Sequence, residues 1–357
     1  MKFIIAFVMV LGSGFSAVAG GSDWRPGSAD VYSAFRSNAP HFWGWLKTQN
    51  SSVLNPSGVV VGDAHILNFG DVQLQGGGRE LSLVDIDDGG QGSLVGDFVR
   101  FAVGNQLSPF QVSMDDLIQS YSYGLSGVEA KKPKVLKDVE SLSDADFQKK
   151  QDKYIDKMTS HDRFNEKAGV ADVATAPADI LNLYQASKNY FFAAMPGYHI
   201  YDLGYKVKES GGSQGLVRFW FLIGKSDDRH IIEFKLETDP AVAEFANQLS
   251  QTQRFNQVAA IYRPSQPAYG PYKFVDTGSA VFLMRARISA FLDFDPLKNT
   301  ASEDIQNGQQ MSLYLANKMG LWQHQQGLSA NILGGSAKGD VKTLTQSYQN
   351  LVLSLSR

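Results

Sequence analysis

The chain has 357 residues, and its 33 basic and 36 acidic side chains give a net charge of −3. This near-neutral balance, without any basic block, argues against a nucleic-acid partner, while 43% hydrophobic residues indicate an ordinary folded protein. The sequence contains no cysteine, which excludes disulfides and a thiol-linked lipid anchor.

The first residues have the pattern of a secretory signal peptide. Lys2 is followed by an apolar stretch over residues 3–11, and small residues at 17–19 precede Gly20. A membrane anchor is the alternative, but the stretch is short for a span and Gly-Ser-Gly at 12–14 interrupts it. We therefore expect residues 1–19 to be removed after Ala19. The mature protein is then periplasmic or secreted, with no integral membrane segment.

The first half of the mature chain predicts a helix, short strands and more helices. Residues 29–50 carry a helical aromatic pattern that Pro40 should break. The stretch 129–167 is dense in charge, which favours a solvated helical hairpin or surface insertion over a partner-binding segment. The other expected elements are strands over 59–61, 71–74 and 81–84, helical patterning from Asp97 onward, and a helix over 181–195.

The second half changes its period. Three antiparallel strands are predicted over 200–207, 216–223 and 230–236, joined by glycine-rich and charged turns. A helix over 242–260 follows, then a strand over 280–287. The last stretch, 305–355, is mostly helical in pattern.

The segment Val61-Gly62-Asp63-Ala64-His65-Ile66-Leu67-Asn68 points to phosphoryl transfer. Protein-kinase chemistry needs a carboxylate that orients the attacking hydroxyl and an amide oxygen that holds magnesium, and Asp63 and Asn68 supply these groups. Asp63 could instead cap the next turn. Gly62 lets the backbone turn without a Cβ clash. We expect His65 to hold the loop by bonding a backbone carbonyl, with metal ligation as the alternative.

An acidic cluster follows the next predicted strand. Asp85, Asp87 and Asp88 are close enough to repel one another, so a bound cation is a natural stabiliser. Asp85 is the candidate metal ligand and Asp87 a supporting group, while a solvated turn is the alternative. Asp97 and Arg100, one helical turn apart, are expected to form a structural pair that braces the loop without touching substrate.

A second constellation lies far downstream. Gly211, Gly212 and Gly215 lie between two predicted strands, and Lys235 lies on the strand after them. A glycine-rich hairpin alone is weak evidence, and a lysine between Phe234 and Leu236 could be an exposed alternate position. Together they match the place where a kinase keeps its phosphate-contacting lysine.

These segments resemble the bacterial family called domain of unknown function 2252, which is similar to the protein-kinase and aminoglycoside-phosphotransferase superfamily. The matching residues are Gly62–Gly70, Asp85–Asp88, Gly96–Ala102 and the strand ending Phe234–Glu237. The resemblance covers most of the mature chain, with dense matches over 59–102 and 200–263.

The resemblance implies an α+β, kinase-like two-lobed fold that is circularly permuted, because the catalytic loop precedes the glycine-rich β lobe. A three-dimensional site does not depend on chain order if the new connection lies at the surface. The implied units are a catalytic-loop part of the helical lobe over 20–195, a small β lobe over 196–263, and the remaining helical lobe over 264–357.

The resemblance also implies the role of each site residue. Asp63 takes the place of the catalytic base, and Asn68 and Asp85 take the places of the magnesium ligands. Lys235 and the amides around Gly212 and Gly215 take the place of the groups that hold the phosphates of ATP. Gln257 stands where the family has a glutamate that pairs with the lysine; a glutamine can bond the lysine but supplies no counter-charge.

Three functions remain open from the sequence. The first is a magnesium- and ATP-dependent phosphotransferase acting on an unknown small-molecule or protein hydroxyl acceptor. The second is a non-catalytic kinase-fold module that binds a ligand or protein in the cell envelope. The third is a metal-dependent phosphoesterase, because Gly62-Asp63-Ala64-His65 resembles the start of a dinuclear metallophosphatase motif; only six histidines are present and none follows a Gly-Asn pair.

Overall fold

The computed structural model describes most of the chain after the expected signal peptide. The expected leader at 1–19 and the glycines Gly211 and Gly212 lie outside the described residues. The structure describes residues 23–25, 30–75, 77–208, 215–225, 228–263, 272–292 and 294–356.

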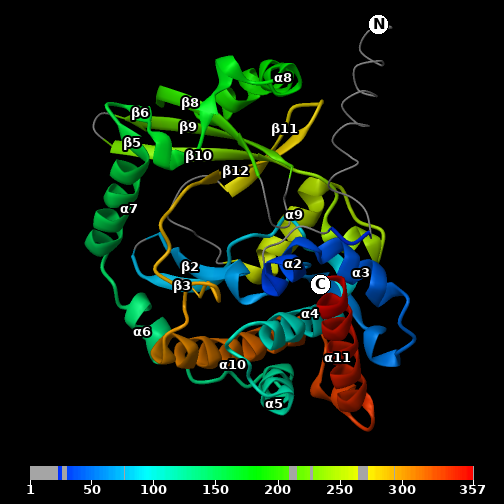
Figure 1. Ribbon diagram of the computed structural model, residues 1–357. Coiled ribbons are helices and arrows are strands. Elements are labelled where there is room, and N and C mark those ends of the chain that lie inside the picture. The colour runs from blue at the N-terminus through cyan, green and yellow to red at the C-terminus, as the bar shows by residue number, and fades with distance from the viewer. Residues whose placement is uncertain are drawn as a thin grey trace, which may run out of the picture.

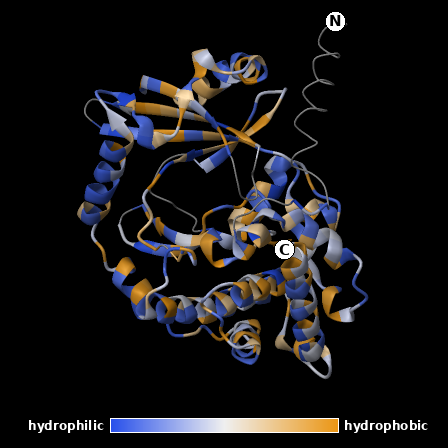
Figure 2. Ribbon diagram, viewed as in Figure 1, coloured by the Kyte–Doolittle hydropathy of each residue, from blue (hydrophilic) through white to orange (hydrophobic). Residues whose placement is uncertain are grey.

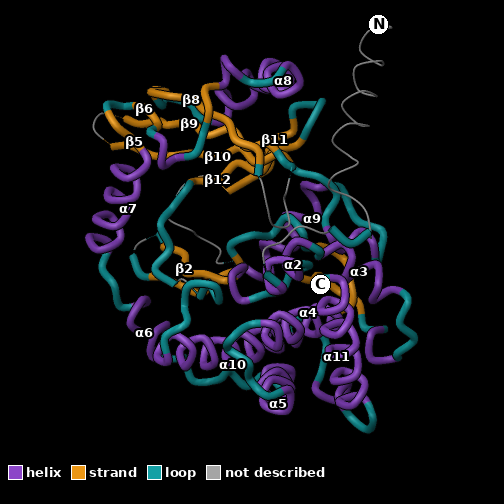
Figure 3. Tube along the Cα trace, in the orientation of Figure 1, coloured by secondary structure: helices purple, strands orange, loops and turns teal. Residues whose placement is uncertain are grey.

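The chain folds into a helical layer and an antiparallel sheet, which agrees with the predicted α+β class (Figure 1, Figure 3). In the helical layer, the helix expected over 29–50 is divided into α2 (Val31–Ser37) and α3 (Ala39–Lys47). The division falls at Asn38, whose side-chain amide donates to the Ala34 carbonyl at 2.8 Å. Pro40 lies in the first turn of α3, where a missing N–H costs nothing, so it starts the second helix.

Two short two-stranded ribbons bring the segment over 61–68 and the acidic cluster at 85–88 side by side. Strand β1 (Ser57–Val60) pairs with β4 (Gly90–Ser93), and β2 (Phe69–Gln73) pairs with β3 (Arg79–Leu83). Val60 lies opposite Gly90 and Phe69 lies opposite Leu83. The loops over 61–68 and 84–89 are therefore anchored at both ends to the same pair of ribbons.

Long helices pack beneath these ribbons. The rings of Phe98 and Tyr121 stack with their centroids 4.0 Å apart, where the helix over 94–107 packs against the helix over 114–125. One large apolar core unites this layer with the ribbons, and its members include Trp43, Phe98 and Leu315, all fully buried. The helices are α4 (Leu94–Leu107), α5 (Met114–Leu125), α10 (Ser302–His324) and α11 (Ala337–Leu355).

The described residues include a six-stranded antiparallel sheet made of β7 (Ala171–Asp172), β8 (His199–Val207), β9 (Val217–Lys225), β10 (Asp228–Leu236), β11 (Tyr272–Asp276) and β12 (Val281–Ala286). Their order across the sheet is β11-β12-β10-β9-β8-β7. The three predicted strands are confirmed as β8, β9 and β10, and the predicted strand over 280–287 is β12. The sheet continues past the boundary expected at residue 263.

Helices cover the sheet and join it to the lower layer. Helix α8 (Ala178–Ala194) packs Phe191 against Phe219 and Phe234 of the sheet. The charge-rich stretch forms α6 (Lys134–Glu140) and α7 (Asp144–Met158), then the short hairpin of β5 (Thr159–Ser160) and β6 (Arg163–Phe164). Figure 2 shows α7 mostly in hydrophilic colours, as expected for a solvated helix.

The helix expected over 242–260 is shorter than predicted. A 3₁₀ turn over Ala241–Glu244 comes first, and helix α9 (Gln251–Tyr262) begins only after Ser250. Between them, the Gln248 side chain bonds Gln91 in β4, accepting from its N–H at 2.8 Å and donating to its carbonyl at 2.9 Å. None of the described helices has the length and apolar character needed to cross a bilayer.

Candidate functional site

The loop after β1 is fixed by buried groups from α3 and α4. The Asp97 carboxylate accepts the N–H groups of Val61 and Gly62 at 2.9 and 3.0 Å, and the Trp43 indole donates to the Gly62 carbonyl at 2.6 Å. Gly62 has a φ of +82°, and a Cβ there would lie 1.9 Å from the Asp88 carbonyl oxygen. The predicted need for glycine is confirmed, and this close approach ties the loop to the acidic cluster.

Asp97 and Arg100 do not form the expected ion pair with each other. Asp97 binds the loop backbone, while Arg100 turns to Asp63, donating from Nε to Oδ1 at 2.9 Å and also from Nη2. Arg100 is fully buried and lies 4.4 Å from the Phe35 ring centroid. Both residues brace the loop, but each does so through its own partner.

His65 contacts the Asp63 carboxylate instead of the expected backbone carbonyl. Its Nε2 lies 3.2 Å from Asp63 Oδ2, and Arg36 Nε lies 3.4 Å from the same ring nitrogen. Burial lowers the pKa of His65, which favours a neutral imidazole, although Asp63 opposes this shift. His65 therefore acts within the structure as a second group that orients Asp63.

Asp63 is held as a carboxylate. Burial favours its neutral form, but Arg100 and His65 outweigh burial and hold its pKa well below the usual range. Its side chain is 9% exposed. Asp63 is thus a buried, charged hydrogen-bond acceptor whose orientation is set by Arg100 and His65.

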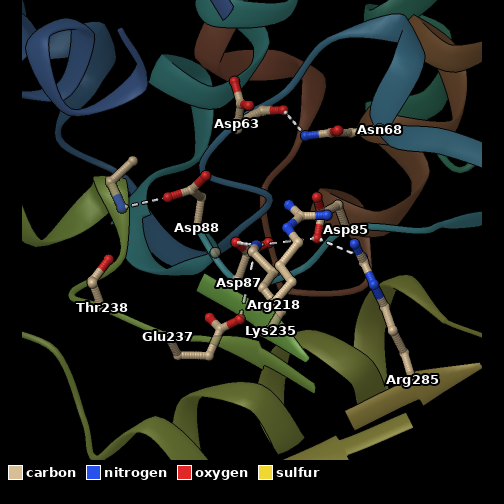
Figure 4. A network of polar contacts seen from close by, with 12 residues as sticks. Asp63, Asn68, Asp85, Asp87, Asp88, Arg218, Lys235, Glu237, Thr238 and Arg285 are labelled. Carbon is tan, nitrogen blue, oxygen red and sulfur yellow. Dashed lines mark hydrogen bonds and ion pairs between the residues drawn. The ribbon is translucent and has the colours of Figure 1, made fainter. Parts of the chain in front are cut away.

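Asn68 lies at the far end of the same loop. Its side-chain amide nitrogen donates to the main-chain carbonyl of Asp63 at 2.7 Å. The main-chain carbonyl of Asn68 accepts the Val84 N–H at 2.8 Å. Because the amide nitrogen faces Asp63, the amide oxygen is directed away from that carbonyl. Figure 4 shows Asp63 and Asn68 together on one side of the cluster.

Lys235 of β10 reaches the acidic cluster that follows β3. Its Nζ donates to the Asp87 carboxylate and lies 3.8 Å from Asp85 Oδ1, and the lysine is 1% exposed (Figure 4). Burial disfavours the ammonium form, but Asp85 and Asp87 outweigh it and raise the pKa of Lys235. The sequence-predicted lysine and aspartates therefore meet, although about 150 residues separate them in the chain.

Glu237 also lies beside Lys235, with its Oε1 3.8 Å from Nζ. Burial raises the pKa of Glu237 to about 8 and that of Asp87 to about 7, and neighbouring carboxylates add to both shifts. Sequence reasoning missed Glu237. The signal was the alternation Glu233-x-Lys235-x-Glu237, which places all three side chains on one face of the strand.

Asp88 faces the other side of the cluster. Its Oδ1 accepts the Ala241 N–H at 2.9 Å. Burial, with the nearby Asp63 carboxylate, raises the pKa of Asp88 to about 6. The three aspartates therefore differ in the direction of their pKa shifts, because Lys235 and Arg285 outweigh burial at Asp85 and hold its pKa well below the usual value.

Arg285 connects the acidic cluster to a second set of charged residues around Glu233. Its Nη1 lies 3.1 Å from Asp85 and its Nε 2.8 Å from Glu233, a fully buried carboxylate. Arg218 Nη1 lies 3.3 Å from Glu233, and the Trp220 indole donates to Glu233 at 2.8 Å. The arginines outweigh burial and hold the pKa of Glu233 well below its usual value. These residues were not among the sequence-predicted site groups.

Gln257 lies apart from Lys235. It is exposed on α9 and accepts from the Gln91 side chain at 3.2 Å. The group that α9 sends to the cluster is Arg254, whose Nη1 donates to the carbonyls of Asp87 and of Gly89, the latter at 2.6 Å. The acidic groups beside Lys235 are therefore Asp85, Asp87 and Glu237, and none comes from α9.

Gly215 is the one glycine of the predicted hairpin within the described residues. It has a φ of +82°, and its N–H donates to the Lys208 carbonyl at 2.8 Å. This bond closes the turn between β8 and β9, next to the strand positions that carry Arg218. Its role toward phosphate stays a prediction.

The donor atoms of the cluster suit magnesium that is bound together with a phosphate. Magnesium prefers oxygen ligands and commonly takes only one or two carboxylates from a protein, with phosphate and water oxygens completing its shell. Asp85, Asp87 and Asn68 offer oxygens of that kind. Across the part of the chain that the structure describes, no three histidine, cysteine or acidic side chains are grouped so that they could hold a metal by themselves.

Comparison with known proteins identifies a family to which most of the chain corresponds. Residues 28–352 match the model of a family described as "Uncharacterized protein conserved in bacteria (DUF2252)". Neither the comparison with curated proteins nor that with solved structures finds a match. The family model spans nearly all of the described fold, including both halves of the candidate site. The chain belongs to the bacterial DUF2252 family.

Proposed function

We propose that this protein is a magnesium- and nucleotide-dependent phosphotransferase with a circularly permuted, two-lobed, kinase-like fold. In this proposal the helical layer with its two ribbons is one lobe, and the six-stranded sheet is the other. The observation that carries the proposal is the meeting of Lys235 with Asp85 and Asp87 beside the Asp63–Asn68 loop. These are the groups that kinase-type phosphoryl transfer requires.

Each residue has a distinct task in the proposed reaction. Lys235 holds the phosphates of the donor, and Asp85 and Asn68 would hold magnesium, which when bound neutralises charge on those phosphates. The acceptor hydroxyl donates a hydrogen bond to Asp63. Its oxygen forms a bond to the terminal phosphorus as the bond to the bridging oxygen breaks, and its proton passes to Asp63 and then to water.

Asp63 contributes mainly by position. Its low pKa makes it a weak base in the resting state, so it accepts the proton only as the oxygen–phosphorus bond forms. Arg100 and His65 fix its carboxylate before the acceptor arrives, which lowers the entropy cost of alignment. Positioning and charge neutralisation therefore supply most of the rate.

The test is a thermal-shift titration of residues 20–357 with ATP and magnesium, with ATP alone and with magnesium alone, followed by an assay of ADP release. A ligand at about a hundred times its dissociation constant adds about 2.7 kcal/mol of stability. We expect nucleotide and metal together to give a larger shift than either gives alone, and we expect turnover that Asp85→Asn abolishes. The matched control Asp156→Asn changes an exposed aspartate on α7 and should retain both.

Two other outcomes identify the alternatives. A shift with nucleotide but no turnover, with water or with added hydroxyl compounds, identifies a non-catalytic binding module. The position of Gln257 favours this second candidate, because the side chain that stands where the family has a glutamate bonds Gln91 and gives the lysine no counter-charge. A shift with manganese or zinc alone would favour the phosphoesterase, whose dinuclear site needs more ligands than Asp63 and His65 supply.

A further inference from the structure

Three cations lie directly opposite one another on neighbouring strands of the sheet. Lys206 of β8 is paired with Arg218 of β9, and Arg218 is paired with Lys235 of β10. Paired residues project from the same face, so the three form a line, the cation row, about 10 Å long at the usual strand spacing. Like charges directly opposite one another destabilise a sheet, so the row needs a compensating partner.

The protein compensates the three cations unequally. Lys235 has Asp85, Asp87 and Glu237 around it, and Arg218 has Glu233. Lys206 has its Nζ 3.5 Å from the Trp220 ring centroid, and no carboxylate among the described residues forms an ion pair with it. Negative charge therefore gathers at the Lys235 end of the row and is lacking at the Lys206 end.

Arg287 adds positive charge near the Lys206 end. Arg287 Nη1 lies 3.8 Å from Glu233, while its Nε is buried without a hydrogen-bond partner in the described part of the chain. The Arg287 side chain is nevertheless 32% exposed. Burial, with Arg287 next in effect, lowers the pKa of Lys206 to about 8. An anion at this end would relieve repulsion and would supply a partner to Arg287.

We infer that the cation row binds the phosphate chain of a triphosphate and that this binding needs no metal. The inference rests on the proposed function, because it places the phosphate chain along Lys206 and Arg218, where negative charge is lacking, with its end directed toward Lys235 of the proposed site. The length of the row is comparable with that of an extended triphosphate. Cations on paired strands are held at fixed spacing, which suits a chain of evenly spaced charges.

The triphosphate could belong to a nucleotide or be inorganic, and the test separates the two. Titration calorimetry of residues 20–357 in EDTA is carried out with ATP and with inorganic tripolyphosphate. We expect binding that weakens as salt rises. Equal affinity for the two probes identifies the phosphate chain alone as the ligand, while tighter binding of ATP identifies a nucleotide.

Two lysine variants make the assignment specific. Lys206→Met keeps an unbranched side chain beside Trp220 and removes the charge over its ring, and we expect about tenfold weaker binding. Lys225→Met is the matched control, because Lys225 also lies over an aromatic ring, 4.6 Å from the Tyr198 centroid, but at the far end of β9. The control should bind as the native chain does.

Absence of binding in EDTA, or equal affinity of Lys206→Met and the native chain, would overturn the inference. If magnesium and ATP still stabilise the protein together in that case, the proposed function survives without the cation row. Conversely, metal-free binding that depends on Lys206, without any magnesium-dependent turnover, retains the cation row and removes the proposed enzyme activity.

Discussion

Lys235 and Asp87 form a buried ion pair that joins the sheet to the helical layer, across 148 positions of sequence. The pair brings two further carboxylates, Asp85 and Glu237, within 3.8 Å of the same ammonium group. One cation thus faces three acids. Because acids held close together in a dry site repel one another, the protonation of this cluster links stability to pH.

Glu237→Gln should stabilise the protein at pH 8 and have little effect near pH 5. The folded state raises the pKa of Glu237 from 4.5 to about 8, so the folded protein binds this proton more tightly than the unfolded chain does. The contribution of this carboxyl group to the free energy of unfolding is therefore most favourable below pH 4.5 and is lost as the pH rises toward 8. Glutamine removes that loss, and we expect a gain of about 2 kcal/mol at pH 8.

Urea unfolding of the native chain and the variant at pH 5 and pH 8 measures this difference. Glu80→Gln is the control, because Glu80 is exposed on β3 and its change should leave the pH dependence as it is. Parallel pH profiles for the native chain and Glu237→Gln would contradict the assigned burial of this acid.

Arg100→Met should destabilise the protein strongly, by about 3–5 kcal/mol, because it leaves the Asp63 carboxylate buried without its main partner. Asp63 has a lowered pKa, so its contribution is present above its usual value of 3.8 and is lost only as pH falls through the folded-state pKa. The loss should therefore be seen in full at pH 7.

A double-mutant cycle with Asp63→Asn isolates the pair. The double variant should lose less stability than the two single losses added together. As a comparison, Lys134→Met breaks an exposed pair with Asp138 and should cost less than about 0.5 kcal/mol. Additive losses at Asp63 and Arg100 would show that the contact has no energetic weight.

The sequence pattern predicted the inner strands of the sheet more accurately than its edge strand β11. Alternating patterns bounded by turn residues located β8, β9 and β10 to within about two residues, because each is long and lies inside the sheet. Strand β11 was missed, since it is only five residues long and follows a proline-rich stretch. The break between α2 and α3 was displaced from Pro40 to Asn38 because proline is tolerated in a first helical turn.

Only part of the candidate site was predicted, because only some of its residues belong to local sequence patterns. Asp63, Asn68, Asp85 and Lys235 stand in recognisable local patterns. Arg285 does not, and its contact with Asp85 spans 200 positions, so only the folded sheet brings the two together. The partner of Arg100 was mistaken because helical spacing favours Asp97, whereas the loop backbone takes both Asp97 oxygens.

Gly62→Ala should cost about 3 kcal/mol or more. A side chain at a φ of +82° is strained, and the new Cβ would meet the Asp88 carbonyl, a backbone atom that cannot rotate away. Gly339→Ala is the matched control, because Gly339 lies in α11 with open space around it. That change should raise stability by about 0.5–1 kcal/mol, since alanine favours the helix.

Urea unfolding again provides the comparison, together with the magnesium- and ATP-dependent shift of each variant. Gly62→Ala should lose the shift even where it remains folded, because the Asp63 loop and the Asp88 loop can no longer approach. Unchanged stability in Gly62→Ala would mean that the two loops are free to separate.

Gln151→Met should loosen the segment that leads from the sheet back to the helical layer. Gln151 is 2% exposed on α7, and its amide donates to the Arg287 carbonyl at 2.9 Å while accepting the Ser289 N–H at 3.0 Å. Methionine fills the space but bonds neither group. We expect a loss of about 1–3 kcal/mol, because two backbone groups lose their partner.

Hydrogen exchange at the Ser289 amide measures the change directly, since its protection depends on the Gln151 oxygen. Gln148→Met, one turn earlier on α7, is the matched control: its side chain bonds Asp152 within the helix, and Ser289 should stay protected. Equal protection of Ser289 in both variants would show that α7 does not hold this connection. Faster exchange in Gln151→Met alone would show that one glutamine fixes the path by which the sheet, and Arg285 with it, is held over the acidic cluster.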